Sequence, residues 1–333
     1  MHKIDLNKYE IRTDMAIDLV KNSEFDSKYK YKDIDVTKIK LDENNVFGKK
    51  KGVYVTLEFG DITDTESKNN VSYVFLEELK KMLEYKGYKK NMSTLIIGLG
   101  NRKSTPDSLG NITIEKVIVT KHLFDLNIDV DSNFSSVSAF SPGVTGQNGI
   151  ETCEYIKAIT NVVKPDFVII IDSLSSNTIS RVNKSIQITD SSITPGAGIG
   201  NERKEISSSE LNVPIIIIGI PTVVSASVIV SDTIKYLMKN YVYNKKLNNN
   251  KAIKLVSKNI NYLNKEIKIT EDDKKKLLGL VGLLSEEELI NLIYEVLTPT
   301  GYDLMVTPKE IDFVIEKLSD ILSYGINHSL HNI

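Results

Sequence analysis

Three short runs of apolar, mostly β-branched residues constrain the fold of this chain more than any other feature. They occupy residues 95–100, 167–171 and 214–220. Runs of this length and composition are typical of strands buried on both faces of a sheet. Residues 71–87 place apolar side chains at helical spacing before the first run. This alternation predicts an α/β fold, with a mainly parallel central sheet and helices on both faces.

Weaker patterns extend this prediction. Residues 52–58 alternate like a strand, and residues 185–188 alternate like a less buried strand. Residues 222–238 are typical of a helix packed after the last strand. The first 45 residues are polar and show little periodicity. We expect a sheet of at least five strands.

The C-terminal third differs in composition from the rest. Residues 239–250 are rich in Lys, Asn and Tyr and predict an exposed linker. Residues 277–297 and 309–330 have amphipathic helical patterns. The first contains a capping-box start, SEEE at 285–288, and the second follows a threonine and proline at 307–308 that predict an N-cap and a first helical residue. The sequence thus predicts a helical C-terminal region.

Composition excludes several classes of protein. The chain has 333 residues, a formal net charge of −2, one cysteine (Cys153) and four histidines. The near-zero charge gives no overall attraction to nucleic acid or an anionic membrane. The apolar runs are far shorter than the roughly 20 residues of a membrane span. A single cysteine and no signal-peptide pattern favour a reducing, cytoplasmic location, and the usual zinc-ligand patterns are missing.

Two aspartates are the strongest candidates for chemistry. Asp107 follows the first apolar run through a glycine-rich loop, and Asp172 directly follows the second. Ligands of open parallel sheets bind beyond the carboxyl ends of strands, so the two carboxyls could share one crevice, one protonated and the other acting as a base on water. A structural interpretation is at least as good from the residues alone, because Asp107 in Thr105-Pro-Asp and Asp172 could each cap a helix.

Other candidates are weaker. The glycine-rich runs at 141–152 and 194–201 could direct backbone N–H groups at an anion or could be tight turns. His122 and Cys153 could form a thiol dyad, but a lone buried cysteine usually packs as a small apolar residue. His328 and His331 lack further ligands and are expected to be solvated.

Several motifs together resemble the germination protease family of endospore-forming bacteria, and they occur in order along most of the chain. They are GLGN at 98–101, TPDSLG at 105–110, VTKHLF at 119–124, SPGVTGQNGIET at 141–152, KPDFVIIID at 164–172, RVN at 181–183, IQI at 186–188, PGAGIGN at 195–201, IPTVV at 220–224 and LMVTPKE at 304–310.

The resemblance implies an α/β fold similar to hydrogenase-maturation peptidases. It also implies a homotetramer and an atypical aspartic endopeptidase that cleaves the small acid-soluble proteins of the spore. Asp107 and Asp172 match the two aspartates that the family requires. No cofactor and no metal are implied, nor a direct nucleic-acid or membrane partner, and the expected location is the cytoplasm of the forespore or the spore core.

The resemblance further implies a zymogen that removes its own N-terminal segment. The sequence YEIRTDMA at 9–16 is similar to the family's processing site and places the cut between Asp14 and Met15. We therefore expect a propeptide over 1–14 and an α/β catalytic domain over 15–240. Residues 241–333 would form the linker and a helical C-terminal region that packs on the core.

The sequence departs from the family pattern at three polar positions. Thr194, Ser225 and Ser180 stand where the family often has His, Asp and Glu, and residues 239–266 match nothing in the family. Two alternatives stay open at this point. One is a peptidase that uses carboxylates to hold a metal, and the other is a non-catalytic module that binds an anion in its glycine loops.

Overall fold

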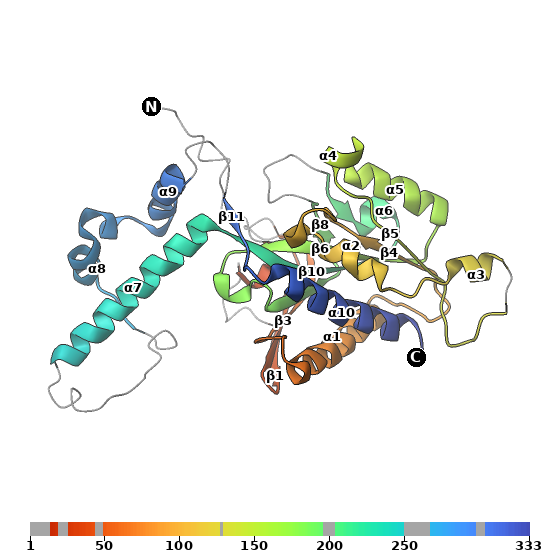
Figure 1. The fold of residues 1–333 in the computed structure, drawn as a ribbon, viewed down its shortest axis with the longest axis horizontal. Helices are drawn as coiled ribbons and strands as arrows, with labels where there is room; N and C mark the ends of the chain where they lie inside the picture. Colours follow the sequence, from red (N-terminus) through yellow and green to blue (C-terminus); the bar gives the residue numbers. More distant parts are fainter. Residues whose placement is uncertain are drawn as a thin grey trace. The chain divides into compact units, whose positions relative to one another are not determined.

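The computed structural model describes residues 14–18, 26–43, 49–126, 129–195, 204–249, 267–297 and 304–333. The chain divides into two compact units (Figure 1). The larger contains Ile11–Val223 and Thr307–Ile333, and the smaller contains Met1–Glu10 and Val224–Val306. Within the described stretches, no helix is both long and apolar enough to cross a membrane.

A mixed sheet forms the centre of the larger unit. Its strands follow the order β1-β2-β3-β7-β10-β6-β4-β5. The last two residues of β10, Val224 and Ser225, pair with β11 and belong with it to the smaller unit. The bounds of the strands are β1 Ser27–Tyr31, β2 Ile34–Leu41, β3 Gly52–Glu58, β4 Thr94–Gly98, β5 Val137–Phe140, β6 Phe167–Ser176, β7 Ser185–Thr189, β10 Ile215–Ser225 and β11 Met305–Val306. A separate ribbon pairs β8 (Ser192–Ile193) with β9 (Ile206–Ser207).

The predicted α/β fold, with its central sheet, its covering helices and its C-terminal helix, is confirmed. Strands β4, β5 and β6 are parallel. Strands β1, β2, β3 and β7 form an antiparallel ribbon that continues the sheet through β10. The parallel part therefore contains the first two apolar runs, and the antiparallel part widens the sheet on the other side.

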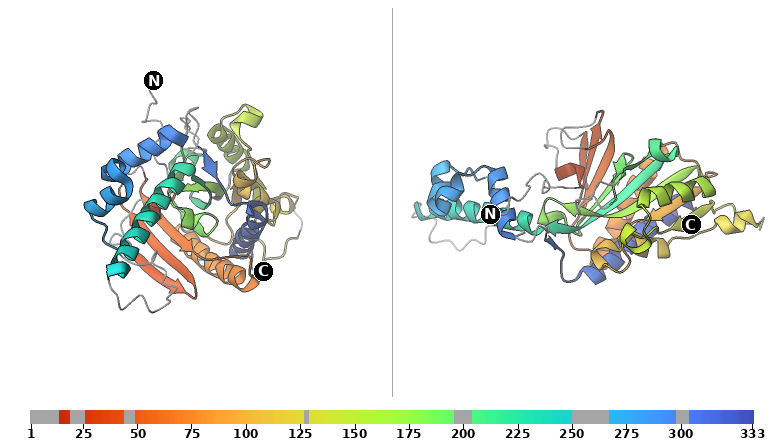
Figure 2. Two further views of the ribbon diagram at one scale, coloured as in Figure 1. Left: turned by 60° about the vertical axis from the view of Figure 1, so that its left-hand side comes forward. Right: turned by 90° about the horizontal axis from the view of Figure 1, so that it is seen from above.

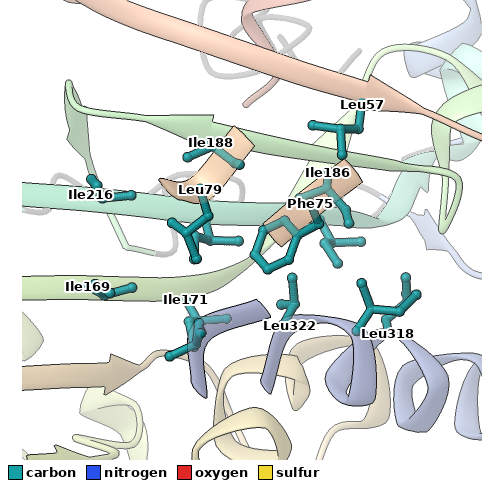
Figure 3. Close-up of a cluster of buried hydrophobic side chains, with 14 of the residues drawn as sticks. Leu57, Phe75, Leu79, Ile169, Ile171, Ile186, Ile188, Ile216, Leu318 and Leu322 are labelled. Atoms are coloured by element: carbon teal, nitrogen blue, oxygen red, sulfur yellow. The ribbon is translucent and has the colours of Figure 1, made fainter. Parts of the chain in front are cut away.

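Three helices cover one face of the sheet. These are α1 (Thr65–Tyr85), α2 (Leu109–Glu115) and α10 (Ile311–Leu330), and α10 lies beside α1 although some 230 positions separate them in sequence (Figure 2). Phe75 and Leu79 of α1 and Leu318 and Leu322 of α10 meet the isoleucines of β6, β7 and β10 in one buried cluster (Figure 3). Burial of this apolar surface is the main source of the unit's stability.

A smaller apolar cluster covers the opposite face. It contains Cys153 and Ile156 of α5 (Thr152–Val163) and Leu211 of α6 (Ser208–Leu211), packed on Val168 and Ile170 of β6. Two short helices, α3 (Lys121–Asp125) and α4 (Thr145–Asn148), lie in the connections around β5. Successive residues of a strand point to opposite faces. Ile169 and Ile171 of β6 belong to the larger cluster and Val168 and Ile170 to the smaller one, which shows the face on which each of these side chains lies.

The smaller unit is helical. It contains α7 (Ala226–Asn249), α8 (Glu271–Leu278) and α9 (Glu286–Leu297). Lys245 of α7 forms an ion pair with Asp273 of α8 at 2.5 Å. The predicted capping box at the start of α9 is confirmed, because the Glu288 carboxylate accepts from the Ser285 N–H at 2.8 Å and the Ser285 hydroxyl accepts from the Glu288 N–H.

Four predictions about local structure are wrong. Strand β10 continues to Ser225, so α7 begins only at Ala226 and not at 222. Residues 239–249 are part of α7 rather than a linker, and the expected boundary at 240 falls inside this helix. Thr307 does not cap α10, because its hydroxyl donates to the Thr222 carbonyl and the helix begins after Glu310. Strands β1 and β2 were not expected at all.

Two predictions about exposure are also wrong. All five residues of β7 are buried, because the strand lies between β3 and β10 and both of its faces are covered. His331 is buried rather than solvated, with 3% of its surface exposed. Its Nδ1 accepts from the Ser135 N–H, and its Nε2 donates to the Ile118 carbonyl, both at 3.2 Å. The C-terminus is thereby tied to the loop before β5.

A glycine in α10 sets its distance from α1, and this contact gives a test of the fold. A Cβ at Gly325 would overlap the ring of Phe75, which is fully buried. We expect Gly325→Ala to lower the free energy of unfolding by about 1–3 kcal/mol, although alanine favours a helix. Gly146→Ala in α4, where a Cβ meets nothing within 4 Å, is the control and should leave the urea midpoint unchanged or raise it slightly, because alanine favours the helix without a clash.

The buried His331 predicts a pH dependence of stability. Burial lowers the pKa of His331, an effect only partly opposed by its hydrogen bond to Ile118. The unfolded chain therefore takes up a proton at a higher pH, near the usual value of about 6.5. Stability contributed by neutral His331 is present above this pH and declines as the pH falls below it. Urea unfolding from pH 7.5 to 5.5 should show a smaller decline for His331→Gln than for the unaltered chain; equal declines would contradict this role.

Candidate active site

Asp172 lies within β6, at the point where the strand leaves its pairing with β4. The last pair in the register is Gly98 with Ile171, and the Leu99 N–H donates to the Ile171 carbonyl at 2.9 Å. The side chain of Asp172 shares a face with Ile170, because the two are separated by two positions along the strand. Only 7% of Asp172 is exposed, and its Oδ1 accepts from the Ser173 N–H at 2.9 Å. Asp172 therefore does not cap a helix.

Asp107 belongs to the loop that follows β4. It ends a 3₁₀ turn, Thr105–Asp107, and its Oδ2 accepts from the Asn101 N–H at 2.9 Å. The same turn is fixed to β10, because the Thr222 hydroxyl donates to the Pro106 carbonyl at 2.6 Å. Asp107 thus holds the loop rather than capping α2. Both aspartates lie at the carboxyl edge of neighbouring parallel strands, where ligands of such sheets bind.

Glycines allow this loop to fold tightly onto the sheet. A Cβ at Gly98 would overlap the backbone of Gly110, so the start of α2 lies directly against β4. Gly100 has a φ of +101°, and a Cβ there would overlap the Asp107 carbonyl. The glycines of GLGN and TPDSLG therefore have a steric role that places Asp107 over the end of β4.

The first glycine-rich run lies beside the Asp107 loop. The Gln147 side chain donates to Asn101 Oδ1 at 2.6 Å, and Asn111 of α2 donates to the Ser141 hydroxyl. These contacts indicate that the run forms a loop lining the same edge of the sheet. Most of the second run, residues 196–201, lies outside the described residues.

A segment from the N-terminal region is bound at the far end of β6. The Asp14 N–H donates to the Ser175 carbonyl at 3.0 Å, and the Ser175 N–H donates to the Asp14 carboxylate at 2.8 Å. Met15 is fully buried in a small cluster with Ile39, Tyr54 and Leu174. Residues 9–13 of the expected processing site lie outside the described residues. The Asp14–Met15 bond itself is described, and it is held three residues along the strand from Asp172.

Two side chains donate to the carbonyl oxygen of Asp14. Lys49 Nζ lies 2.8 Å from this oxygen and Gln187 Nε2 lies 3.2 Å from it. Gln187 also accepts from the Ala16 N–H through Oε1 at 2.8 Å. Burial lowers the pKa of Lys49, while the negative charges of Asp14 and Asp18 act in the opposite direction. The carbonyl of the expected scissile bond therefore faces two donors.

The other end of the segment is held by charge. Asp18 forms an ion pair with Arg181, which also donates to Glu58 at 2.8 Å. The Asn177 N–H donates to the Asp18 carboxylate at 2.9 Å. The chain from Asp14 to Asp18 is thus fixed at both ends and buried between them, and Ala16–Asp18 form a short 3₁₀ turn.

Sequence reasoning missed Lys49, Gln187 and Ser175. Gln187 carried the clearest signal, because it is a polar residue between two buried isoleucines of β7 and its side chain must point to the other face. Lys49 gave no signal, since it lies in a lysine-rich stretch where nothing distinguishes one lysine from the next.

The remaining candidates lie elsewhere or have other partners. His122 is exposed on α3, whereas Cys153 is fully buried in the apolar cluster of α5, where burial raises the pKa of its thiol. They do not form a dyad. Ser180 shares a hydrogen bond with Thr178, and Ser225 with Ser227. The described part of the chain contains no group of three or more His, Cys, Asp or Glu side chains placed to hold a metal ion.

The steric role of Gly100 can be tested directly. Gly100→Ala adds a Cβ that overlaps the backbone of Asp107 at a φ that L residues rarely adopt. We expect the peptidase activity implied by the motifs to fall by about 100-fold, because small displacements of a reacting group have effects of this size. Gly60→Ala, where a Cβ meets nothing within 4 Å, is the matched control. Equal rates of peptide hydrolysis for the two variants would contradict this role.

Comparison with known proteins agrees with these observations. Residues 6–333 match the family described as germination protease. The germination protease of Bacillus cereus (strain ATCC 10987 / NRS 248) is 43% identical over 358 residues, covering 99% of this chain and 96% of the relative. That of Bacillus mycoides (strain KBAB4) is 42% identical with the same coverage.

Among solved structures, a [NiFe] hydrogenase maturation protease from Thermococcus kodakarensis KOD1 is 17% identical. The match covers 44% of this chain and 80% of the maturation protease, with a TM-score of 0.27. The assignment rests on the sequence matches, which extend over nearly the whole chain and include both strand ends that carry the aspartates. The chain belongs to the germination protease family and is a peptidase.

Proposed function

We propose that this chain is an endopeptidase that begins the degradation of small acid-soluble spore proteins during germination. It is made as a zymogen and cleaves itself between Asp14 and Met15, which removes the propeptide 1–14. Asp107 and Asp172 activate the attacking water. The proposal combines the family, the position of the two aspartates and the N-terminal segment bound near them.

The observation that carries the proposal is the bound segment. The Asp14–Met15 bond is held at the end of β6 by hydrogen bonds from Ser175 and Gln187, on the strand that also carries Asp172. Strand alternation places Asp172 and Leu174 on one face of the sheet, and Met15 packs on Leu174. An inhibitory segment bound in this way occupies the position that a substrate would need, which accounts for an inactive precursor.

The chemistry follows from the two carboxyl groups. In the proposed mechanism one of the two carboxyls carries a proton and the other is ionised. The ionised carboxylate takes a proton from water as the water oxygen attacks the peptide carbonyl. The protonated carboxyl supplies a proton to the leaving amine.

The substrate, assembly and location belong to the same proposal. The family implies small acid-soluble spore proteins as substrates, a homotetramer as the assembly, and the forespore or spore core as the location. An acidic residue followed by an apolar residue and alanine, as at 14–16, is the sequence expected at the cut.

Mass spectrometry of a small acid-soluble spore protein incubated with the processed enzyme tests the proposal. We expect one principal cut, after an acidic residue. Asp107→Asn and Asp172→Asn should each lower the rate by at least about 100-fold, because general acid–base catalysis contributes that much or more. Asp166→Asn is the matched control. Asp166 also adjoins β6, but its carboxylate accepts from Ser93 before the strand begins, so the rate should be unchanged.

Three results would contradict the proposal. Activity retained by Asp172→Asn in a folded protein would exclude the two-aspartate mechanism. Loss of activity in EDTA, restored by a divalent metal, would favour the metal-dependent alternative. No cleavage by any folded preparation, together with stabilisation by a small anion, would favour the non-catalytic binding module.

A further inference from the structure

We propose that Lys49 and Gln187 are the donor pair that polarises the Asp14 carbonyl and stabilises the negative charge that forms on its oxygen during hydrolysis. The inference rests on the proposed cut between Asp14 and Met15 and adds two catalytic residues to it. Both are additional to Asp107 and Asp172, the two residues that the proposed mechanism already uses.

The geometry of the two donors supports this role. Both approach the same oxygen, Lys49 Nζ at 2.8 Å and Gln187 Nε2 at 3.2 Å. Removal of one such donor typically lowers the rate of acyl transfer by 10²- to 10³-fold, since the donor is already in place when the charge develops. When protonated, Lys49 is a cationic donor, and its hydrogen bond to a developing oxyanion is stronger than one from a neutral group.

Burial around the Asp14 carbonyl strengthens its stabilisation by the two donors. Gln187 is 5% exposed and Met15 is fully buried, so little water is available to screen the carbonyl. Burial disfavours the charged form of Lys49, and the carboxylates of Asp14 and Asp18 favour it. A charge held close to the carbonyl in such surroundings acts more strongly than it would in water.

The orientation of Gln187 is fixed by the peptide itself. Its amide nitrogen donates to the Asp14 carbonyl, and its amide oxygen accepts from the Ala16 N–H at 2.8 Å. These are the two hydrogen bonds that a neighbouring strand would make around Met15. The reverse orientation of the amide would lose both, so the donor must face the bond to be cut.

The position of Gln187 in the sheet agrees with a shared site. Ile186 and Ile188 point into the cluster under α1 and α10, so Gln187 points to the opposite face. Ile169 and Ile171 belong to the same cluster, which places Asp172 on that opposite face as well. Strand β10 lies between β7 and β6. The donors and the Asp172 carboxyl therefore act on one side of the sheet.

The reaction balances without a further reactant. Water adds its oxygen to the carbonyl carbon of Asp14, and the π electrons of the carbonyl move to the oxygen held by Lys49 and Gln187. The proton lost by water goes to the basic carboxylate. When the oxyanion collapses, the bond to the Met15 nitrogen breaks and that nitrogen takes a proton from the acidic carboxyl. The products are a carboxyl group at Asp14 and an amine at Met15.

Self-cleavage of the full chain tests the inference. The rate of loss of residues 1–14 is followed by intact-mass spectrometry for the unaltered chain, Lys49→Met, Lys49→Arg and Gln187→Glu. We expect Lys49→Met to cut about 100-fold more slowly or worse, and Lys49→Arg to recover part of the rate because it keeps a cationic donor. Gln187→Glu keeps the acceptor for Ala16 and loses the donor, so it should also be slow. Lys50→Met is the control, because Lys50 pairs with Glu205 at 3.4 Å, and it should cut at the unaltered rate.

A second measurement separates polarisation from simple anchoring. Hydrogen exchange at the amides of Asp14 and Ala16 is compared in Asp172→Asn and in the Asp172→Asn, Lys49→Met double variant, neither of which should cut. If Lys49 polarises the carbonyl, exchange in the two proteins should differ by less than about threefold, because the hydrogen bonds to Ser175 and Gln187 still hold the segment.

The outcomes are distinct. A folded Lys49→Met chain that cuts at the unaltered rate overturns the inference but leaves the proposed function intact. Slow cutting with a large loss of exchange protection also overturns it, since Lys49 would then only anchor the segment. If the unaltered chain makes no cut between Asp14 and Met15, the proposed function fails and the inference fails with it.

Discussion

The parallel pairing of β4 with β6 determines where every candidate residue lies. It brings the ends of two strands to one edge of the sheet, and the Leu99 N–H closes the register on the Ile171 carbonyl. Asp172 follows at the next position of β6, and the glycines at 98 and 100 turn the chain so that Asp107 lies over the same edge. A change in this register by one residue would move Asp172 to the face packed under α1 and α10.

Strand β6 then has a second use. Its first half is a buried parallel strand, and its second half continues past β4 to Ser176. There its backbone groups bind Asp14 of the N-terminal segment. The strand that positions a candidate catalytic carboxyl therefore also binds the bond on which that carboxyl is proposed to act. In this account, one rigid element provides both the chemistry and the inhibition.

The sequence predicted the parts of the fold that local patterns control. The buried parallel strands, α1 and the capping box at Ser285 are examples, because each depends on nearby residues. Asp172 was expected directly after its strand but lies within β6, which continues to Ser176. Prediction from the sequence failed where contacts with distant segments determine the local structure or the burial of a residue. The polar stretch 239–249 is helical, with Val242 buried and Lys245 paired to Asp273. Strand β7 is buried because a segment more than 160 positions away covers its polar side. Lys49 is distinguished only by the carbonyl that it contacts.

The central claim is that Asp107 and Asp172 hydrolyse the bond between Asp14 and Met15 by activating water. Its most direct test is self-cleavage in ¹⁸O-labelled water, with intact mass and N-terminal sequence determined for the unaltered chain and for Asp172→Asn. The account predicts a new N-terminus at Met15 and one ¹⁸O atom in the carboxyl group formed at Asp14, with neither in the variant. A cut at another bond, or the same labelled cut in Asp172→Asn, would contradict it.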